Sequence, residues 1–75
     1  MATAFVLIKV EVGKARKALE KVKGIEGVVE AYLAAGPYDI VAKVETAFEK
    51  ITDLVAEKIH GVEGVKETLT LIAFK

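Results

Sequence analysis

Two short motifs each occur twice in this chain, in the same order and at nearly the same spacing. KVE stands at residues 9–11 and again at 43–45, and GxEGV stands at 24–28 and again at 61–65. Such a repeat predicts two equivalent halves that contribute the same supersecondary unit to one fold. The second pair of motifs is three residues further apart than the first. We therefore expect the second helix to be nearly one turn longer than the first.

The hydrophobic pattern of the first half changes its period at Gly13. Residues 3–12 alternate between two faces, which is the period of a β-strand. After Gly13 the apolar residues fall at helical spacing with basic residues largely opposite them, and Gly24 offers a stop. Residues 28–34 return to β-type side chains. The first half therefore predicts a strand, a short amphipathic helix and a second strand.

Gly36 and Pro37 are the strongest turn signal in the chain. Pro37 fixes φ and lacks the N–H that a central strand needs, so the second strand should end near residue 35. The third strand runs from about 39 to 45, and so short a link between two strands predicts a hairpin.

A helix and a last strand complete the second half. Residues 46–49, TAFE, have the Ser/Thr-x-x-Glu form of a capping box, which predicts a helix with Thr46 as its N-cap. An apolar stripe continues to Ile59, Gly61 ends the helix, and residues 65–74 form the last strand. The order βαββαβ predicts a single α+β domain, residues 1–75, with the ferredoxin-like arrangement: a four-stranded antiparallel sheet with both helices on one face.

The sheet face without helices is expected to be apolar. The alternation places Val6, Ile8 and Val44 toward the helices, and it leaves a second apolar set on the opposite face. A monomer that exposed this set would show an apolar patch larger than soluble proteins usually carry. A chain of 75 residues also has a small core, and oligomerisation is the remaining way to reinforce it because cysteine is absent. We predict a homodimer that packs sheet against sheet through Phe5, Leu7, Val41, Ile72 and Phe74.

Composition excludes several function classes. Eleven basic and eleven acidic residues cancel, which removes the positive field of a nucleic-acid-binding protein. No stretch is long enough to span a membrane or to form a signal peptide, so we expect a cytoplasmic protein. Asn, Gln, Ser, Cys and Trp are absent while Lys and Glu are abundant, a pattern reported for hyperthermophiles. Small-sample bias in a short chain is the other interpretation of this pattern.

Three segments together resemble one known family. They are TAFVLIKVEVG at the start, the predicted hairpin VVEAYLAAGPYDIVAKVE, and GVEGVKETLTLIAF at the end. Together they look like the effector-binding and oligomerisation domain of the Lrp/AsnC family of feast/famine regulators, in a stand-alone form without the DNA-binding helix-turn-helix. The most specific elements are Gly36-x-Tyr38-Asp39 and Val65-x-x-Thr68-x-Thr70.

The resemblance implies a function, partners and a site. It implies a regulator module that binds small effectors, typically free amino acids, at crevices between dimers, with the dimers assembled into a ring such as an octamer. It implies that contact with DNA comes through full-length Lrp/AsnC partners. Carried over by motif, the ligand-binding positions are Gly36, Tyr38, Asp39, Thr68 and Thr70. Backbone N–H groups and threonine hydroxyls bind a carboxylate, and an aspartate neutralises an ammonium, so this set suits an α-amino acid.

Each of these positions also has a purely structural interpretation. Asp39 is a residue that commonly hydrogen-bonds its own turn. Tyr38 is equally suited to an interface, where its ring packs and its hydroxyl stays wet. Thr68 and Thr70 are also explained by the β propensity of threonine. All of these alternatives stay open from the sequence.

The remaining polar residues predict no catalytic or metal site. The basic residues of the first helix are expected to form a solvated face, because no aromatic side chains lie among them to stack on bases. His60 stands alone, which favours a contact with the end of the second helix over a metal ligand. No nucleophile stands beside a base, and we expect neither an enzyme nor a cofactor.

Three functions are therefore compared. The leading hypothesis is a stand-alone amino-acid sensor that oligomerises and modulates transcription through DNA-binding partners. The second is a purely structural oligomerisation module without a ligand. The third, remote one is a small dimeric α+β barrel enzyme, which would require a cavity enclosed between two sheets.

Overall fold

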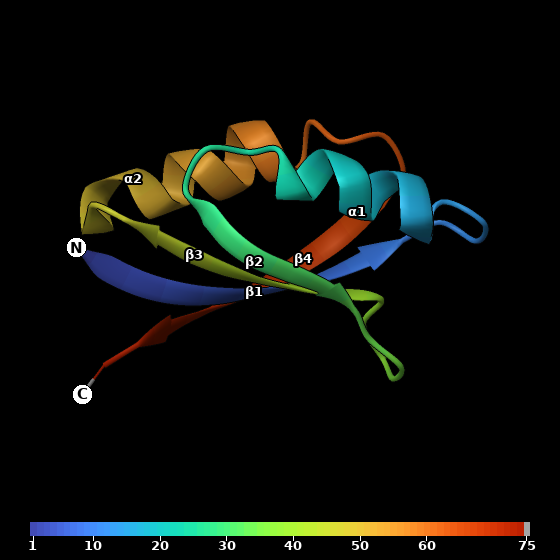
Figure 1. The fold of residues 1–75 in the computed structure, drawn as a ribbon, viewed down its shortest axis with the longest axis horizontal. Coiled ribbons are helices and arrows are strands. Elements are labelled where there is room, and N and C mark those ends of the chain that lie inside the picture. Colours follow the sequence, from blue (N-terminus) through green and yellow to red (C-terminus); the bar gives the residue numbers. More distant parts are fainter. Residues whose placement is uncertain (75) are drawn as a thin grey trace.

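The computed structural model describes residues 1–74, and the order of its elements is the predicted one. Four strands and two helical segments follow each other as strand, helix, strand, strand, helix, strand (Figure 1). The second helical segment is α-helical in its first half and π-helical in its second. The bounds are β1 Ala2–Val10, α1 Ala15–Lys23, β2 Val28–Leu33, β3 Ile40–Thr46, α2 Phe48–Asp53, η1 Leu54–Ile59 and β4 Val65–Ala73.

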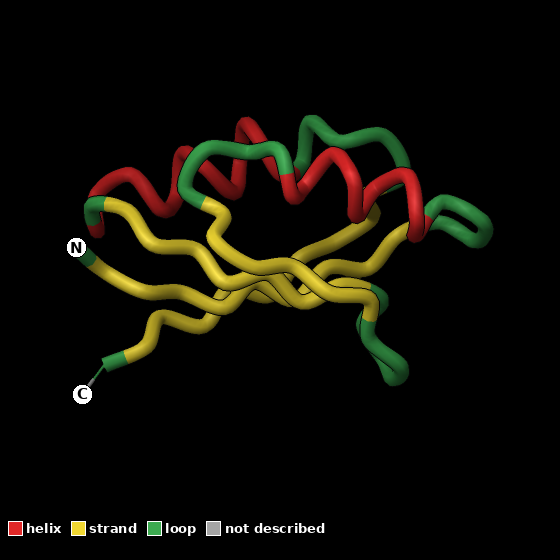
Figure 2. Tube along the Cα trace, in the orientation of Figure 1, coloured by secondary structure: helices red, strands yellow, loops and turns green. Residues whose placement is uncertain are grey.

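The four strands form one antiparallel sheet in the order β2-β3-β1-β4. The helices lie together on one side of this sheet, and no helix within residues 1–74 covers the other side (Figures 1 and 2). This is the predicted ferredoxin-like α+β architecture. The two edge strands are β2 and β4, so their outer edges have no partner strand within the part of the chain described.

The core lies between the sheet and the helices. The helix-facing side is buried from Ala4 to Val10 in β1 and from Ile40 to Val44 in β3, as the alternation predicted. Val22 from α1 and Ile59 from η1 cover this face and are themselves inaccessible to solvent. The largest fully buried side chains are Val6, Ile8, Val22, Ile40, Val44 and Ile59. Burying side chains of this size contributes roughly 1.5–3 kcal/mol each.

The sequence repeat corresponds to a repeat in the backbone hydrogen bonds. The N–H of Glu11 donates to the carbonyl of Gly64, and the N–H of Glu45 donates to the carbonyl of Gly27, both at 2.8 Å. Each KVE motif therefore ends its strand against the GxEGV motif of the other half. The register shifts by a bulge at both places, between Val28 and Glu30 in β2 and next to Lys9 and Val10 in the β1–β4 pair. The two halves are intertwined rather than side by side.

The second helical segment is longer than the first, as the motif spacing predicted. It spans the six residues of α2 and the six of η1, against nine in α1. The predicted capping box is wrong, however. Thr46 is the last residue of β3, where it pairs with Ala2, and the N-cap of α2 is Ala47 without a side-chain hydrogen bond. Pairing with β1 keeps Thr46 in the strand, so its hydroxyl does not cap the helix.

The predicted face of β4 is also wrong. Thr68, Thr70 and Ile72 pair with the buried residues of β1 and therefore face the helices. The bulge at the start of β4 is the reason: it pairs Val65 with Val10 and Glu67 with Lys9, which inverts the alternation beyond it. Ile72 is thus not on the open face. Phe74 follows the end of β4 with 84% of its surface exposed.

The open face is nevertheless apolar along its centre. Phe5, Leu7 and Val41 lie on it as predicted, and the register adds Leu69 and Leu71 from β4. Phe5, Leu69 and Leu71 are 38%, 44% and 50% exposed. Sequence alternation found the patch on β1 and β3 but missed its β4 half.

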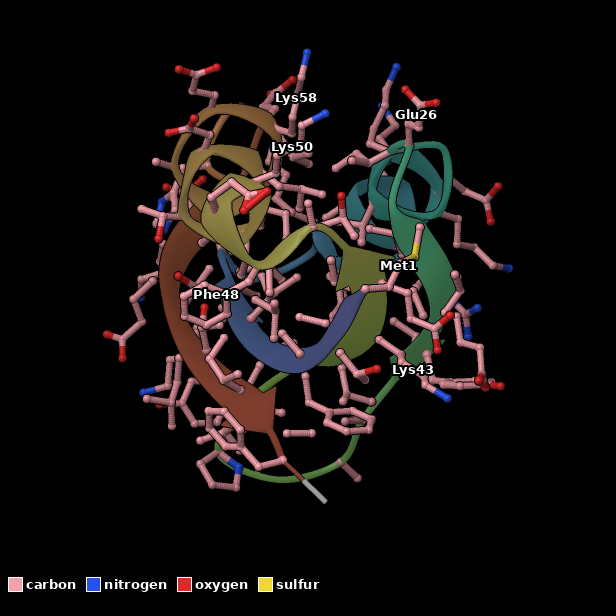
Figure 3. All side chains as sticks on the ribbon, turned by 90° about the vertical axis from the view of Figure 1, so that its left-hand side faces the viewer. Met1, Glu26, Lys43, Phe48, Lys50 and Lys58 are labelled. Carbon is pink, nitrogen blue, oxygen red and sulfur yellow. The ribbon has the colours of Figure 1, made fainter. Side chains whose placement is uncertain are left out.

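A polar strip runs beside this apolar patch on β2 and β3. The ammonium of Lys43 lies 3.8 Å from the carboxylate of Glu30 and 3.7 Å from that of Glu45. The hydroxyl of Tyr32 donates to Glu30 at 2.6 Å. This hydrogen bond, together with the negative charge of Glu30, raises the pKa of Tyr32 above its usual 10.0. Figure 3 shows Lys43 on the side of the sheet away from the helices.

Candidate functional site

The hairpin between β2 and β3 positions the first group of predicted site residues. It is closed by a hydrogen bond from the Ala34 N–H to the Asp39 carbonyl at 2.8 Å, and it is joined to β1 by one from the Asp39 N–H to the Ile8 carbonyl at 2.9 Å. Gly36 lies at the exposed tip, with nothing within 4 Å of the place where a Cβ would stand. The tip is therefore open on the side of Gly36.

The Asp39 side chain is engaged with the backbone of β1. Its Oδ2 accepts a hydrogen bond from the Val10 N–H at 2.9 Å. Asp39 precedes the first residue of β3, and its carboxylate stands in there for a main-chain acceptor. It thereby satisfies a partly buried donor beside the bulge. Among the residues described, Oδ1 has no hydrogen-bond partner and the carboxylate has no ion pair. Asp39 thus has a structural contact and a second oxygen that is still available.

Tyr38 lies against β1 on the open face. Its ring stands 5.6 Å from the ammonium of Lys9, a distance at which a cation is attracted to an aromatic face. Both residues are only partly exposed. This contact holds the aromatic side chain beside the strand, next to the Asp39 carboxylate.

Thr68 and Thr70 lie on the opposite side of the sheet. The hydroxyl of Thr68 is 2.9 Å from Nε2 of His60, which joins the start of β4 to the end of η1. Thr70 lines a groove of about 490 Å³ between β4 and the second helical segment. Apolar side chains from both elements make up most of its wall; the lining includes Phe48, Ile51, Val55, His60, Thr70 and Ile72.

One protomer does not bring the two groups together. Asp39 contacts Ile8 from the β3 side, whereas Thr68 is paired with Ile8 from the β4 side. Two inter-strand spacings separate them, roughly 10 Å. Tyr38 is on the open face and Thr68 faces the helices. A molecule as small as an amino acid cannot contact both groups of one chain with its carboxylate and ammonium.

Sequence reasoning missed His60 and Phe48 as neighbours of the threonines. His60 stands at the C-cap of η1, at the helix end where the sequence placed it, and its ring also contacts Thr68 eight residues later. Phe48 is 62% exposed at the mouth of the groove, and Figure 3 shows it between α2 and β4. The sequence shows an apolar helical stripe that includes Phe48 and Val55, but the register of β4 decides which β4 side chains face that stripe.

No group of three or more His, Cys, Asp or Glu side chains that could hold a metal is present among residues 1–74. Within the same residues, no helix combines the length and apolar character that crossing a bilayer requires.

Comparison with known proteins shows the family of this chain. Residues 3–75 match the family model of the Lrp/AsnC ligand binding domain. An HTH-type transcriptional regulator of Pyrococcus furiosus is 36% identical over 76 residues, which are 96% of this chain. The match covers 51% of that regulator, so the chain spans about half the length of the curated relative. A 51-residue stretch of the homocitrate synthase of Sulfolobus acidocaldarius, 11% of that enzyme, is 43% identical.

Solved structures give the same result. The protein TTHA0845 from Thermus thermophilus superposes with a TM-score of 0.94 and 39% identity, covering 100% of this chain and 95% of its own. AsnC of E. coli superposes with a TM-score of 0.89 and 26% identity over 99% of this chain and 51% of its own. A feast or famine regulatory protein from M. tuberculosis, in complex with L-methionine, shares the fold at a TM-score of 0.81 and 24% identity over 100% of this chain and 51% of its own. The chain belongs to the Lrp/AsnC family and corresponds to the ligand-binding domain of its transcriptional regulators.

Proposed function

We propose that this chain is an amino-acid-sensing module that oligomerises and modulates transcription through DNA-binding relatives. The observation that carries the proposal is the hairpin, where a carboxylate with one oxygen unpartnered among residues 1–74 lies in the same turn as an open glycine tip. The L-methionine complex of a protein with the same fold supports an amino acid as the ligand. Cytoplasmic action follows from a role in transcription.

The first step of the proposal is a homodimer through the open sheet face. The open face carries a continuous apolar patch centred on β1, because Phe5 pairs with Leu71 and Leu7 pairs with Leu69 and Val41. A second copy is the natural cover because a two-fold axis places the same patch on both sides of the interface. The polar strip of Lys43, Glu30 and Glu45 lies at the rim of the proposed interface, since removing its charges from water without new partners would cost stability.

The second step is a ring of dimers, such as an octamer, in which effector sites are shared between chains. The hairpin residues and the threonine groove are on opposite sides of one sheet. A complete site with both groups therefore requires the hairpin of one chain and the groove of another. Sharing of this kind would couple effector binding to assembly, because a ligand held by two chains stabilises the contact between them.

The chemistry of the effector follows from the groups present. The free Oδ1 of Asp39 suits the ammonium group of an amino acid, and backbone N–H groups of the hairpin suit its carboxylate. The groove at Thr70 is mostly apolar and suits an aliphatic or thioether side chain. Gly36 leaves the approach to the hairpin free of side-chain atoms.

Calorimetric titration with each of the twenty amino acids tests the sensor. At least one should bind, and Asp39→Asn should abolish that binding while the fold is retained, because the amide still accepts from Val10 but carries no charge. Asp53→Asn is the matched control, since Asp53 is exposed on α2 far from the hairpin. If none of the twenty binds to a correctly assembled protein, the sensor is excluded and the structural oligomerisation module remains.

A second candidate is a regulatory module for a biosynthetic enzyme. The identity with a stretch of homocitrate synthase favours it, because part of this domain also occurs within an enzyme chain. Both candidates use the same effector site but differ in the partner. Co-purification of the tagged chain with a purified Lrp/AsnC regulator and with homocitrate synthase distinguishes them: effector-dependent retention of only one identifies the partner class.

A further inference from the structure

The two halves of the chain differ at one equivalent position. In the first half the N-cap of the helix is Lys14, whose side chain crosses to the 61–65 motif and pairs with Glu63 at 3.2 Å. In the second half the N-cap is Ala47, and the residue equivalent to Glu63 is Glu26. The methyl group of Ala47 has no charge with which to pair with Glu26. Among the residues described, Glu26 has no ion pair.

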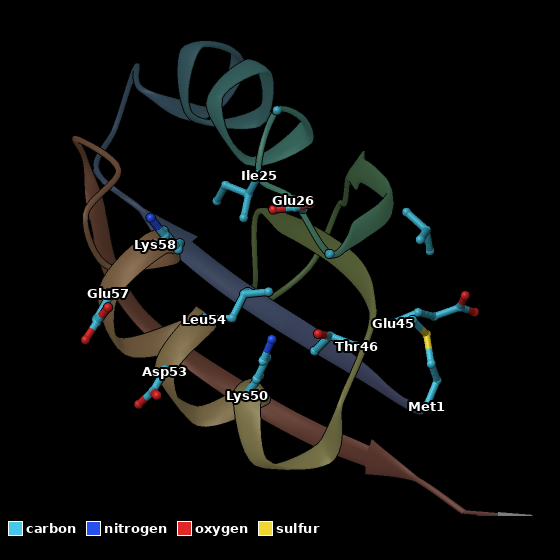
Figure 4. A pocket seen from close by; sticks show the side chains of 13 residues that line it. Met1, Ile25, Glu26, Glu45, Thr46, Lys50, Asp53, Leu54, Glu57 and Lys58 are labelled. Carbon is cyan, nitrogen blue, oxygen red and sulfur yellow. The ribbon is translucent and has the colours of Figure 1, made fainter.

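The position of the missing side chain lies at a groove on the helix side of the protein. A groove of about 880 Å³ separates the 24–27 loop from α2 and η1 (Figure 4). Glu26 and Ile25 point into it from the loop, while Leu54 and Lys50 point into it from the helix. Figure 3 shows the same groove end-on, with Glu26 on one wall and Lys50 and Lys58 on the other. In the first half, by contrast, Lys14 packs close to Gly64 and lies across the corresponding position.

The charges of the groove define the ligand that fits. Glu45 at its edge is already paired with Lys43, and Figure 4 shows the Asp53 and Glu57 carboxylates pointing away from the hollow. Among residues 1–74, Glu26, Lys50 and Lys58 of the lining have no ion pair. A carboxylate on the loop wall and ammonium groups on the helix wall therefore flank an apolar floor of Ile25 and Leu54. A volume of this size is within the range of small-molecule sites.

We infer that this groove binds an aliphatic molecule with an ammonium group at one end and a carboxylate at the other. The ammonium of the ligand pairs with Glu26, just as the ammonium of Lys14 pairs with Glu63 in the first half. The methylene chain covers Ile25 and Leu54, and the carboxylate meets Lys50. The site is separate from the hairpin and from the groove at Thr70, and it does not depend on the proposed effector site.

NMR titration of the full ¹⁵N-labelled chain with 6-aminohexanoate tests the inference. The amides of Gly24 and Gly27 should shift, whereas those of Gly61 and Gly64 in the closed half should not. Hexanoate lacks the ammonium and hexylamine lacks the carboxylate, so each should bind more weakly. Because 6-aminohexanoate has no α-ammonium group, Asp39→Asn should leave its binding unchanged, which separates this site from the proposed effector site.

Charge-changing variants test which side chains bind 6-aminohexanoate. Glu26→Gln should weaken 6-aminohexanoate binding by about threefold to fivefold, the worth of an exposed ion pair, while Glu63→Gln, the matched control in the closed half, should not. Ala47→Lys should give Glu26 an ion-pair partner like the one that Glu63 has in Lys14, and the new side chain should block binding of 6-aminohexanoate in the groove. Absence of shifts at Gly24 and Gly27, equal shifts in both halves, equal binding of hexanoate, or an unaffected Glu26→Gln variant would each overturn the inference.

Discussion

The carboxylate of Asp39 accepts a hydrogen bond from the backbone N–H of Val10 at 2.9 Å, which ties the β2–β3 hairpin to the end of β1. Val10 is also where the register of the β1–β4 pair shifts. The Asp39 side chain thus connects the β2–β3 turn to the end of β1, where the register of the β1–β4 pair shifts. Any change at the hairpin that moves Asp39 alters the end of β1.

Asp39→Ala should lower the free energy of unfolding by about 1 kcal/mol, because the part-buried N–H of Val10 loses its acceptor. Asp39→Asn should lower the free energy of unfolding by less than half as much, since the amide oxygen of asparagine also accepts a hydrogen bond from the Val10 N–H. Urea unfolding at one fixed protein concentration measures both. Equal losses for the two variants would show that the charge, rather than the hydrogen bond, is what stabilises the hairpin.

Gly27→Ala should destabilise the fold by roughly 1–3 kcal/mol through backbone strain, because Gly27 has φ +104. An added Cβ would also lie 2.7 Å from Cδ1 of Leu54, which must then move. Gly24→Ala is the control: its φ is negative, and its nearest contact would be 3.6 Å. Thermal unfolding of the two variants should differ clearly, and equal melting temperatures would contradict the close approach of loop and helix.

Leu71→Glu should convert the proposed dimer to a monomer, because the register places Leu71 on the open face opposite Phe5. A carboxylate there would be desolvated in the interface without a partner. Sedimentation should show the smaller species at concentrations where the unchanged chain is dimeric. Val12→Glu, on a fully exposed residue outside the strands, should leave the dimer intact. A dimer that tolerates Leu71→Glu would place the interface elsewhere.

Glu30→Gln should lower the pKa of Tyr32 toward 10.0, since the hydrogen bond and the charge of Glu30 both favour the neutral phenol. The sign for stability follows from linkage: a pKa raised in the folded chain gives stability that is present below pH 10 and is lost as the pH rises through the folded value. Because the chain has two tyrosines, titration of tyrosinate absorbance in a Tyr38→Phe background measures the shift of Tyr32. Glu45→Gln is the control, because Glu45 pairs with Lys43 and makes no hydrogen bond to Tyr32.

Much of the fold was predictable because local patterns and the repeat agree. Alternation identified the buried side of β1 and β3, glycines marked the helix ends, and the motif spacing predicted a longer second helical segment. The capping role of Thr46 failed because strand pairing competes with capping for the same residue, and the sequence contains both signals. The hairpin position of Tyr38 and Asp39 was predictable from Gly36 and Pro37 alone.

The sequence by itself determined the order of elements, the hairpin and the repeat, because these depend on residues close together in the chain. Only the tertiary structure decided the face of β4, since a bulge of one residue inverts every side chain beyond it and leaves the alternation unchanged. It also decided that Asp39 caps Val10, and that Lys14 closes one half while Ala47 leaves the other open. Those contacts join residues distant in sequence, and they exist only once the two halves have packed.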